Sequence, residues 1–248
     1  MTSNGYIEEI QYIGPPDDIK RYPYNLAFLT SLNNLKLNEK VTFIIGENGS
    51  GKSTLIEAIA IAYGFNAEGG SKNFNFGLKD CSSDLYKRII LKKTAHRAKD
   101  GFFLRAESFY NVAAEIERLD AIPAAAPKII DAYGGRSLHE QSHGESFLAL
   151  MNNRFTGNGI YILDEPESAL SAQRQLSFLS QLHTLVKKNS QFIIATHSPI
   201  ILSYPYSTIY SLDHDKIEIK DYTETPPYQF TKMFINDYKQ VLHYLFLK

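Results

Sequence analysis

The segment with the clearest chemical potential is a glycine-rich run that ends in a lysine and hydroxyl residues. It reads Gly46-Glu47-Asn48-Gly49-Ser50-Gly51-Lys52-Ser53-Thr54 and matches the pattern GxxxxGK[ST]. Glycines let backbone N–H groups curl around phosphate oxygens, and the helix expected to follow adds its positive end. We expect Lys52 to reach the outer phosphates and Ser53 to hold Mg²⁺. A purely structural glycine turn is the alternative, but the strand and helix patterns on either side favour phosphate binding.

A second candidate is the acidic pair Asp164-Glu165, which follows the apolar run 160–163 and lies 112 residues after Lys52. Ligands of open α/β sheets bind at the carboxyl ends of the strands. We therefore expect Asp164 on the Mg²⁺ side and Glu165 as the general base for an attacking water. Such a pair alone is also typical of a solvated turn, so the interpretation depends on the phosphate loop in the same chain.

Two further motifs complete an ordered set. The run Ser142-His143-Gly144-Glu145 lies 22 residues before Asp164, and His197 follows Glu165 by 32 residues. Taken alone, a histidine after an apolar strand is more often a structural residue than a functional one. In this order, however, the motifs resemble the phosphate loop, signature, acidic strand and switch histidine of ABC-type ATPases.

The resemblance implies a nucleotide and a dimer. In that family two subunits pair head to tail, and each Mg-ATP lies between the phosphate loop of one subunit and the signature of the other. It therefore implies that Ser142, Gly144 and Glu145 contact ATP held by a second copy of this chain. It also implies a catalytic role for Lys52 and Glu165, and for His197 beside the attacking water and the γ-phosphate.

Several residues depart from the family pattern and indicate which groups within the family this chain resembles. Histidine stands at 143 in place of the usual glycine, glutamate at 145 in place of glutamine, and Ser171 in place of an interface aspartate. With Glu47 and the run 196–199, these features are more similar to soluble RecF-like, OLD-like and chromosome-maintenance ATPases. The closest resemblance is to small bacterial predicted ATPases with RecF-like heads.

The resemblance leads to one expected function and two alternatives. We expect a soluble ATPase that couples closure of its dimer to a partner protein or DNA, in genome maintenance or defence. One alternative is the nucleotide-binding subunit of an ABC transporter, which similar size and motif order support. The other is a nucleotide-dependent switch that barely hydrolyses ATP.

Three further features carry two interpretations each. Glu107 follows the apolar run 101–104 near the position where this family places a Mg²⁺-contacting glutamine, but it also fits an ordinary surface glutamate. The basic run 87–99 suits the phosphates of a nucleic acid or a solvated helix face. Among the aromatics before the phosphate loop, Tyr24 is our candidate for stacking on adenine, with core packing as the alternative.

Positioning these motifs requires alternating strands and helices. Apolar runs predict strands at 41–45, 101–104, 160–163, 192–195 and 208–212. Helical periodicity follows at 52–63, 144–153 and 170–186. The alternation predicts an α/β P-loop NTPase fold, with a mixed or parallel sheet flanked by helices plus a small helical lobe. We expect one domain with a nucleotide-binding core at 1–107 and 157–222, a lobe at 108–156 and a C-terminal helix at 228–247.

The composition limits the cellular compartment and the kinds of partner that we expect. The 248 residues are 44% hydrophobic and 21% charged, which is typical of a globular domain. Because 26 basic residues stand against 27 acidic ones, the net charge of −1 gives no bulk attraction to nucleic acid or anionic membranes. The single cysteine, Cys81, excludes an intramolecular disulfide and favours a cytoplasmic location. No run reaches the roughly 18 apolar residues of a membrane span, so a membrane role would need a partner subunit.

Overall fold

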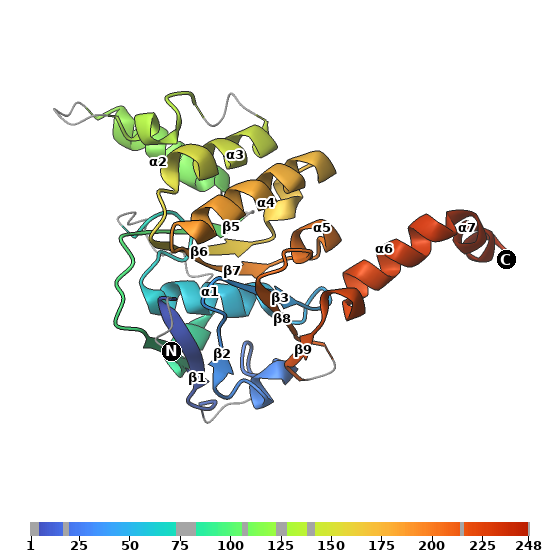
Figure 1. Ribbon diagram of the computed structural model, residues 1–248. Coiled ribbons are helices and arrows are strands. Elements are labelled where there is room, and N and C mark those ends of the chain that lie inside the picture. Colours follow the sequence, from blue (N-terminus) through green and yellow to red (C-terminus); the bar gives the residue numbers. More distant parts are fainter. Residues whose placement is uncertain are drawn as a thin grey trace.

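The computed structural model describes residues 5–16, 20–72, 83–105, 109–122, 128–137, 142–213 and 216–247. Its main sheet contains β3 (Val41–Ile45), β5 (Asp100–Arg105), β6 (Gly159–Asp164), β7 (Gln191–Ala195), β8 (Ser207–Ser211) and β9 (Glu218–Lys220). The strand order is β5-β6-β7-β3-β8-β9 (Figure 1). All neighbours in the sheet are parallel except the antiparallel pair β8–β9. The expected α/β class and all five expected strands are confirmed, and the carboxyl ends of the parallel strands share one edge.

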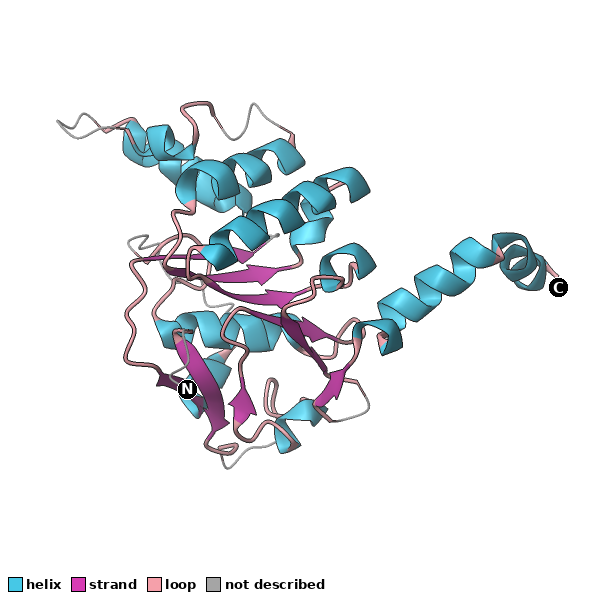
Figure 2. Ribbon diagram, viewed as in Figure 1, coloured by secondary structure: helices cyan, strands magenta, loops and turns pink. Residues whose placement is uncertain are grey.

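Helices cover both faces of this sheet (Figure 2). They are α1 (Lys52–Tyr63), α2 (Phe109–Asp120), α3 (His143–Arg154) and α4 (Ala172–Lys187). Successive strand residues point to opposite faces, so Phe43 belongs to the core under α3 and α4, whereas Ile44 packs with Leu55 and Ile59 of α1. The chain leaves α1 at Gly64, where a left-handed φ of 109° ends the helix as expected.

A second, antiparallel sheet packs beside α1. It contains β1 (Ile7–Tyr12), β2 (Leu35–Lys36) and β4 (Ile89–Lys93) in the order β2-β1-β4. The basic run 87–99 begins at the end of the 3-10 helix η2 (Asp84–Arg88), then follows β4 and its loop, so a helix face is the wrong geometry for it. Lys92 Nζ lies 3.3 Å from a carboxylate oxygen of Glu8, and Lys93 Nζ lies 4.8 Å from the ring centre of Tyr63. Part of the positive charge of this run therefore already contacts groups of β1 and α1.

Asp100 anchors the edge of the main sheet to the end of α3. Its carboxylate accepts hydrogen bonds from Arg154 at 2.8 Å, from the Tyr161 hydroxyl at 2.7 Å and from the backbone N–H of Thr156 at 2.9 Å. Burial acts to raise the pKa of Asp100, but these hydrogen bonds and the charge of Arg154 outweigh it and hold the pKa below its usual range. The network fixes the end of α3 against the strands, and η4 (Ile129–Tyr133) contacts both α2 and α3.

The C-terminal segment departs from expectation. After α5 (Pro199–Leu202) and η7 (Tyr222–Glu224), the predicted single helix 228–247 is instead two helices, α6 (Pro226–Asn236) and α7 (Tyr238–Phe246). The break occurs because Asp237 leaves the helical conformation and its side chain accepts a hydrogen bond from the N–H of Gln240 at 3.1 Å. Both helices project from the body of the molecule (Figure 1). Among the described residues, no helix combines the length and apolar character needed to cross a bilayer.

Candidate functional site

The phosphate loop connects β3 to α1 in a conformation that requires glycine. Gly49 and Gly51 have φ values of 83° and 94°, in the left-handed region. A Cβ at position 51 would lie 2.7 Å from the ring of Phe28, which packs beneath the loop in η1 (Ala27–Thr30). Ser50 Oγ is buried and has no hydrogen-bond partner among the described residues. A bound phosphate would supply that partner, so the loop fits the expected ligand.

Lys52 lies at the start of α1 and is only 4% exposed. Its Nζ donates hydrogen bonds to the carbonyl oxygens of Gly46 at 2.8 Å and Glu47 at 2.9 Å. Burial lowers the pKa of Lys52, and nearby carboxylates counteract this shift, led by Glu165 and Asp164 and followed by Asp213 and Glu167. The cation therefore lies within an acidic site at the mouth of the phosphate loop.

Ser53 and Asp164 meet at the expected metal position. The Ser53 hydroxyl donates to Asp164 Oδ1 at 3.2 Å, although the two residues are 111 positions apart in sequence. A hydroxyl and one carboxylate are a suitable protein contribution for Mg²⁺, which keeps several waters and takes its remaining oxygens from phosphates. No cluster of three or more metal-ligating side chains occurs in the described ranges. Glu107, our third candidate, lies outside the described residues, as does Cys81.

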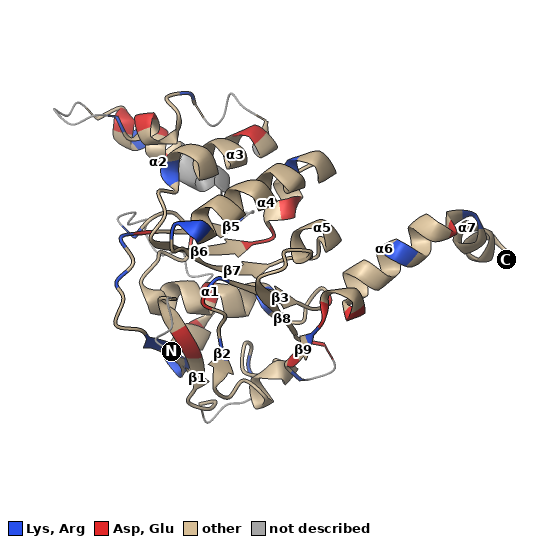
Figure 3. Cartoon of the chain, viewed as in Figure 1, with Lys and Arg blue, Asp and Glu red and all other residues tan. Residues whose placement is uncertain are grey.

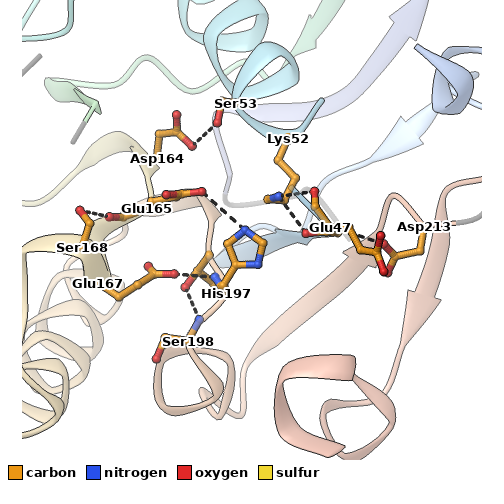
Figure 4. A network of polar contacts seen from close by, with 12 residues as sticks. Glu47, Lys52, Ser53, Asp164, Glu165, Glu167, Ser168, His197, Ser198 and Asp213 are labelled. Atoms are coloured by element: carbon orange, nitrogen blue, oxygen red, sulfur yellow. Dashed lines mark hydrogen bonds and ion pairs between the residues drawn. The ribbon is translucent and has the colours of Figure 1, made fainter. Parts of the chain in front are cut away.

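Glu165 and His197 face each other across the ends of β6 and β7 (Figure 4). Glu165 has a left-handed φ of 50°, and its backbone N–H donates to the carbonyl oxygen of Ala195 at 2.9 Å. Its Oε1 lies 3.5 Å from His197 Nε2, and this nitrogen has no hydrogen-bond partner in the described structure. Glu167 accepts a hydrogen bond from the backbone N–H of His197 at 2.5 Å. The strained backbone at Glu165 thus aims a carboxylate at a histidine that a second carboxylate holds in place.

A cavity of about 940 Å³ opens beside the phosphate loop. Its wall combines residues 46–50 and His197 with the segment 25–28, Asp213 and the start of α6. Asp213 Oδ1 accepts a hydrogen bond from the backbone N–H of Glu47 at 3.1 Å, which fixes the loop to the end of β8. The cavity therefore extends the phosphate site with a mixed polar and apolar wall.

The aromatic residues before the phosphate loop are arranged differently from our prediction. Tyr24 is 7% exposed and its hydroxyl points to the carbonyl oxygen of Asp84, so it fits the core alternative rather than an adenine stack. Tyr22 is 56% exposed, and its hydroxyl lies 2.6 Å from Thr54 Oγ1 at the start of α1. Tyr22 is thus the exposed aromatic that contacts the end of the phosphate-loop motif.

The signature residues gather at the N-terminus of α3. The backbone N–H and hydroxyl of Ser142 both donate to Glu145, at 3.1 and 2.8 Å. Arg174 of α4 donates to Ser142 Oγ and to Glu145 Oε1, both at 3.0 Å, and lies close against Gly144. The hydrogen bonds from Ser142, followed by the charge of Arg174, lower the pKa of Glu145. Ser142, Gly144 and Glu145 do not line the cavity, so the chain presents its phosphate loop and its signature at separate places.

Comparisons with known proteins agree with this fold. Residues 25–119 match the family model of an AAA domain. The hemin import ATP-binding protein HmuV of Idiomarina loihiensis is 24% identical over 214 residues, covering 79% of this chain and 81% of the relative. The structure of cbiO1 from Clostridium perfringens, part of the ABC transporter complex cbiONQ, aligns with a TM-score of 0.53 and 17% identity over 93% of this chain and 95% of that one. An inward-facing metal-chelate type ABC transporter aligns with a TM-score of 0.50 and 17% identity, covering 92% of this chain and 88% of that one.

The chain has the fold of an ABC-type P-loop ATPase. The family resemblance read from the motif order is thereby confirmed. At 17% identity the solved structures establish the fold of this chain and not the process that it serves.

Sequence reasoning missed Asp213 and Arg174, and it preferred Tyr24 to Tyr22. Asp213 directly follows the run 208–212 that was predicted as a strand, so its place at a carboxyl end was available as a signal. Arg174 lies on a predicted helix and nothing in its spacing indicates a contact with Ser142. Tyr22 is one of 16 tyrosines, and only its exposure beside Thr54 distinguishes it.

Proposed function

We propose that this chain binds Mg-ATP on its phosphate loop and hydrolyses it in a head-to-tail dimer. The observation that supports this proposal most strongly is the convergence of five motif residues that follow the ends of three strands. Ser53 meets Asp164 at 3.2 Å, Glu165 lies 3.5 Å from His197, and Lys52 lies among their carboxylates. A structural turn needs no such combination of hydroxyl, amine, carboxylates and imidazole.

Each residue has a distinct part in the proposed reaction. Lys52 turns its ammonium from two loop carbonyls to the β- and γ-phosphates. Ser53 and Asp164 hold Mg²⁺, which when bound neutralises charge that develops on the phosphates. Glu165 accepts a proton from the attacking water as that water approaches the γ-phosphorus. His197, held through its backbone by Glu167, orients the water and the γ-phosphate.

The second copy supplies the signature. In the proposed dimer, Ser142, Gly144 and Glu145 at the N-terminus of α3 face the γ-phosphate bound by the other subunit, so the positive end of the helix adds to its stabilisation. Arg174 brings a further positive charge to the same place and keeps Ser142 and Glu145 ordered. The separation of signature and phosphate loop within one chain supports this arrangement.

Mixing two inactive variants tests the head-to-tail geometry. Lys52→Ala removes the phosphate contact. Ser142→Asp adds a second carboxylate beside Glu145, whose charge Arg174 already balances, and so repels the incoming phosphates, while aspartate still caps helices well. Each variant alone should release almost no phosphate from ATP. A mixture whose subunits have been allowed to exchange should recover roughly a quarter of wild-type activity, because half of the dimers are then mixed and one of their two sites is intact.

The control mixture combines Lys52→Ala with the double variant carrying both substitutions, which leaves no intact composite site. Thermal melting of each variant establishes that loss of activity is not loss of folding. Activity of either single variant at the wild-type level, or a mixture no more active than the control, would contradict the proposal.

We further propose that dimer closure acts on a partner protein or DNA, in the cytoplasm, as a DNA-maintenance or defence machine. The unusual signature residues His143 and Glu145 support this proposal. A transporter subunit is the second candidate, favoured by the similarity to HmuV and to cbiO1. Affinity purification from detergent-solubilised cells separates them, because only the transporter candidate predicts a stoichiometric integral membrane subunit.

A further inference from the structure

The projecting helices α6 and α7 carry an exposed apolar surface. We define the C-terminal arm as residues 226–247. Its nine exposed large hydrophobic residues are between 37% and 78% exposed. They are Phe230, Met233, Phe234, Ile235, Tyr238, Tyr244, Leu245, Phe246 and Leu247. No side chain of α6 or α7, both of which are fully described, is buried.

The size of this surface is that of a protein interface. Aromatic side chains present about 150–250 Å² each when fully exposed, so the exposed parts of these nine side chains add up to roughly 1,000 Å². A stable interface needs about 800 Å² from each partner. Isolated monomers rarely expose contiguous apolar patches larger than a few hundred Å². The arm by itself therefore offers one subunit's share of a standard interface.

The charges on the arm argue against an anionic lipid surface as its occupant. Lys232, Asp237 and Lys239 are the acidic and basic residues in the sequence of the arm, which gives a formal net charge of +1. Figure 3 shows both helices mostly free of charged residues. Helices that lie on anionic membranes are rich in lysine and arginine on one face. The arm has aromatic and aliphatic residues instead, which suit another apolar protein surface.

The position of the arm favours a second copy of this chain as that surface. Pro226, Pro227, Phe230 and Thr231 at its base line the cavity beside the phosphate loop. In the proposed function the second subunit approaches this same loop, so this step of the argument rests on that proposal. A protein already bound at the arm would lie next to the nucleotide.

We infer that the arms of two copies pack against each other and hold the subunits together without nucleotide. Two-fold symmetry is the commonest symmetry of homodimers, and a surface that is buried across a two-fold axis packs against the same surface of the second copy. Four helices, two from each arm, would share one apolar core. The arm keeps the subunits paired between rounds of ATP-driven closure.

Light scattering during size-exclusion chromatography of the nucleotide-free protein at micromolar concentration tests this inference. The wild-type chain should elute as a dimer. The variant Phe234→Glu/Leu245→Glu should be monomeric, with dimer affinity at least about 100-fold weaker, because each subunit would place two carboxylates in the apolar contact. The matched control Leu176→Glu/Ile219→Glu changes two equally apolar residues that are 60% and 66% exposed outside the arm, and it should stay dimeric.

Three results would overturn the inference: a monomeric wild-type chain, a dimer that survives the arm substitutions, or binding of the wild-type chain to phosphatidylcholine vesicles while it remains monomeric. The same chromatography with Mg-ATP separates this inference from the proposed function. If the arm dimer forms and ATP hydrolysis is absent, the arm inference stands and the proposed function fails. If the nucleotide-free protein is a monomer and Mg-ATP drives its association, the arm inference fails and the proposed function stands.

Discussion

Replacement of Glu165 by glutamine tests the general base at the end of β6. The amide retains the size of the side chain but cannot accept the proton of the attacking water. General-base catalysis contributes about 10²- to 10⁴-fold to a rate. The turnover number kcat should fall by that factor, which corresponds to about 3–5 kcal/mol of activation free energy. The KM for ATP should change little, because the lost interaction belongs to the transition state.

The structure also predicts that Glu165→Gln leaves the fold intact. The side chain is 40% exposed, and its 3.5 Å neighbour His197 can hydrogen-bond an amide as well as a carboxylate. The backbone N–H of residue 165 keeps its 2.9 Å hydrogen bond to Ala195, so the free energy of unfolding should change by less than about 0.5 kcal/mol.

Phosphate release at saturating Mg-ATP and thermal melting are the two assays for this prediction. Glu115→Gln on α2 is the matched control, because it makes the same chemical change in an ion pair with Arg118 that lies outside the cavity beside the phosphate loop. A kcat within about threefold of wild type would refute the assignment of Glu165 as the base. A large loss of stability would refute the structural reasoning instead.

Two stability predictions concern residues that hold the site in place. Gly51→Ala should lower the free energy of unfolding by about 2–5 kcal/mol and weaken ATP binding, since position 51 combines a left-handed φ with a Cβ contact of 2.7 Å to Phe28. Gly14→Ala is the control, because Gly14 has a φ of 89° and nothing within 4 Å of an added Cβ. It should lower the free energy of unfolding in urea by only about 1 kcal/mol. Asp100→Asn should cost about 3 kcal/mol at pH 7 because it leaves the charge of Arg154 unpaired. Since the folded-state pKa of Asp100 lies below the unfolded value near 3.9, its contribution is present above pH 4 and is lost as the pH falls. The stability difference between wild type and Asp100→Asn should therefore shrink in unfolding titrations below pH 4, and a difference that grows there would contradict this account.

The parts of the site that sequence predicts well are those fixed by strand ends. Asp164 and His197 each follow a short apolar run, and both runs are buried parallel strands whose carboxyl ends share one edge of the sheet. Lys52 follows a third run, and the motif itself specifies the loop. Neighbouring positions at one sheet edge therefore follow from local patterns alone.

The parts that sequence did not predict depend on contacts between distant segments or on a local side-chain hydrogen bond. Strand β4 has three apolar residues, 89–91, but they stand within the basic run 87–99, and only Ile89 of the strand is buried. The contact of Arg174 with Ser142 joins two helices 32 residues apart. The break at Asp237 follows from a local capping hydrogen bond that competes with good helix periodicity on both sides. Tertiary neighbours determine the first two features, and a contact within the segment determines the third.

The most direct test of the central claim is the molar mass of the Glu165→Gln/Phe234→Glu/Leu245→Glu protein with and without Mg-ATP. Its arm cannot pair and its site cannot hydrolyse, so any association must come from the nucleotide sandwich. We predict a monomer without nucleotide and a dimer with Mg-ATP. A protein that binds Mg-ATP and remains monomeric at all concentrations would contradict a head-to-tail ATPase.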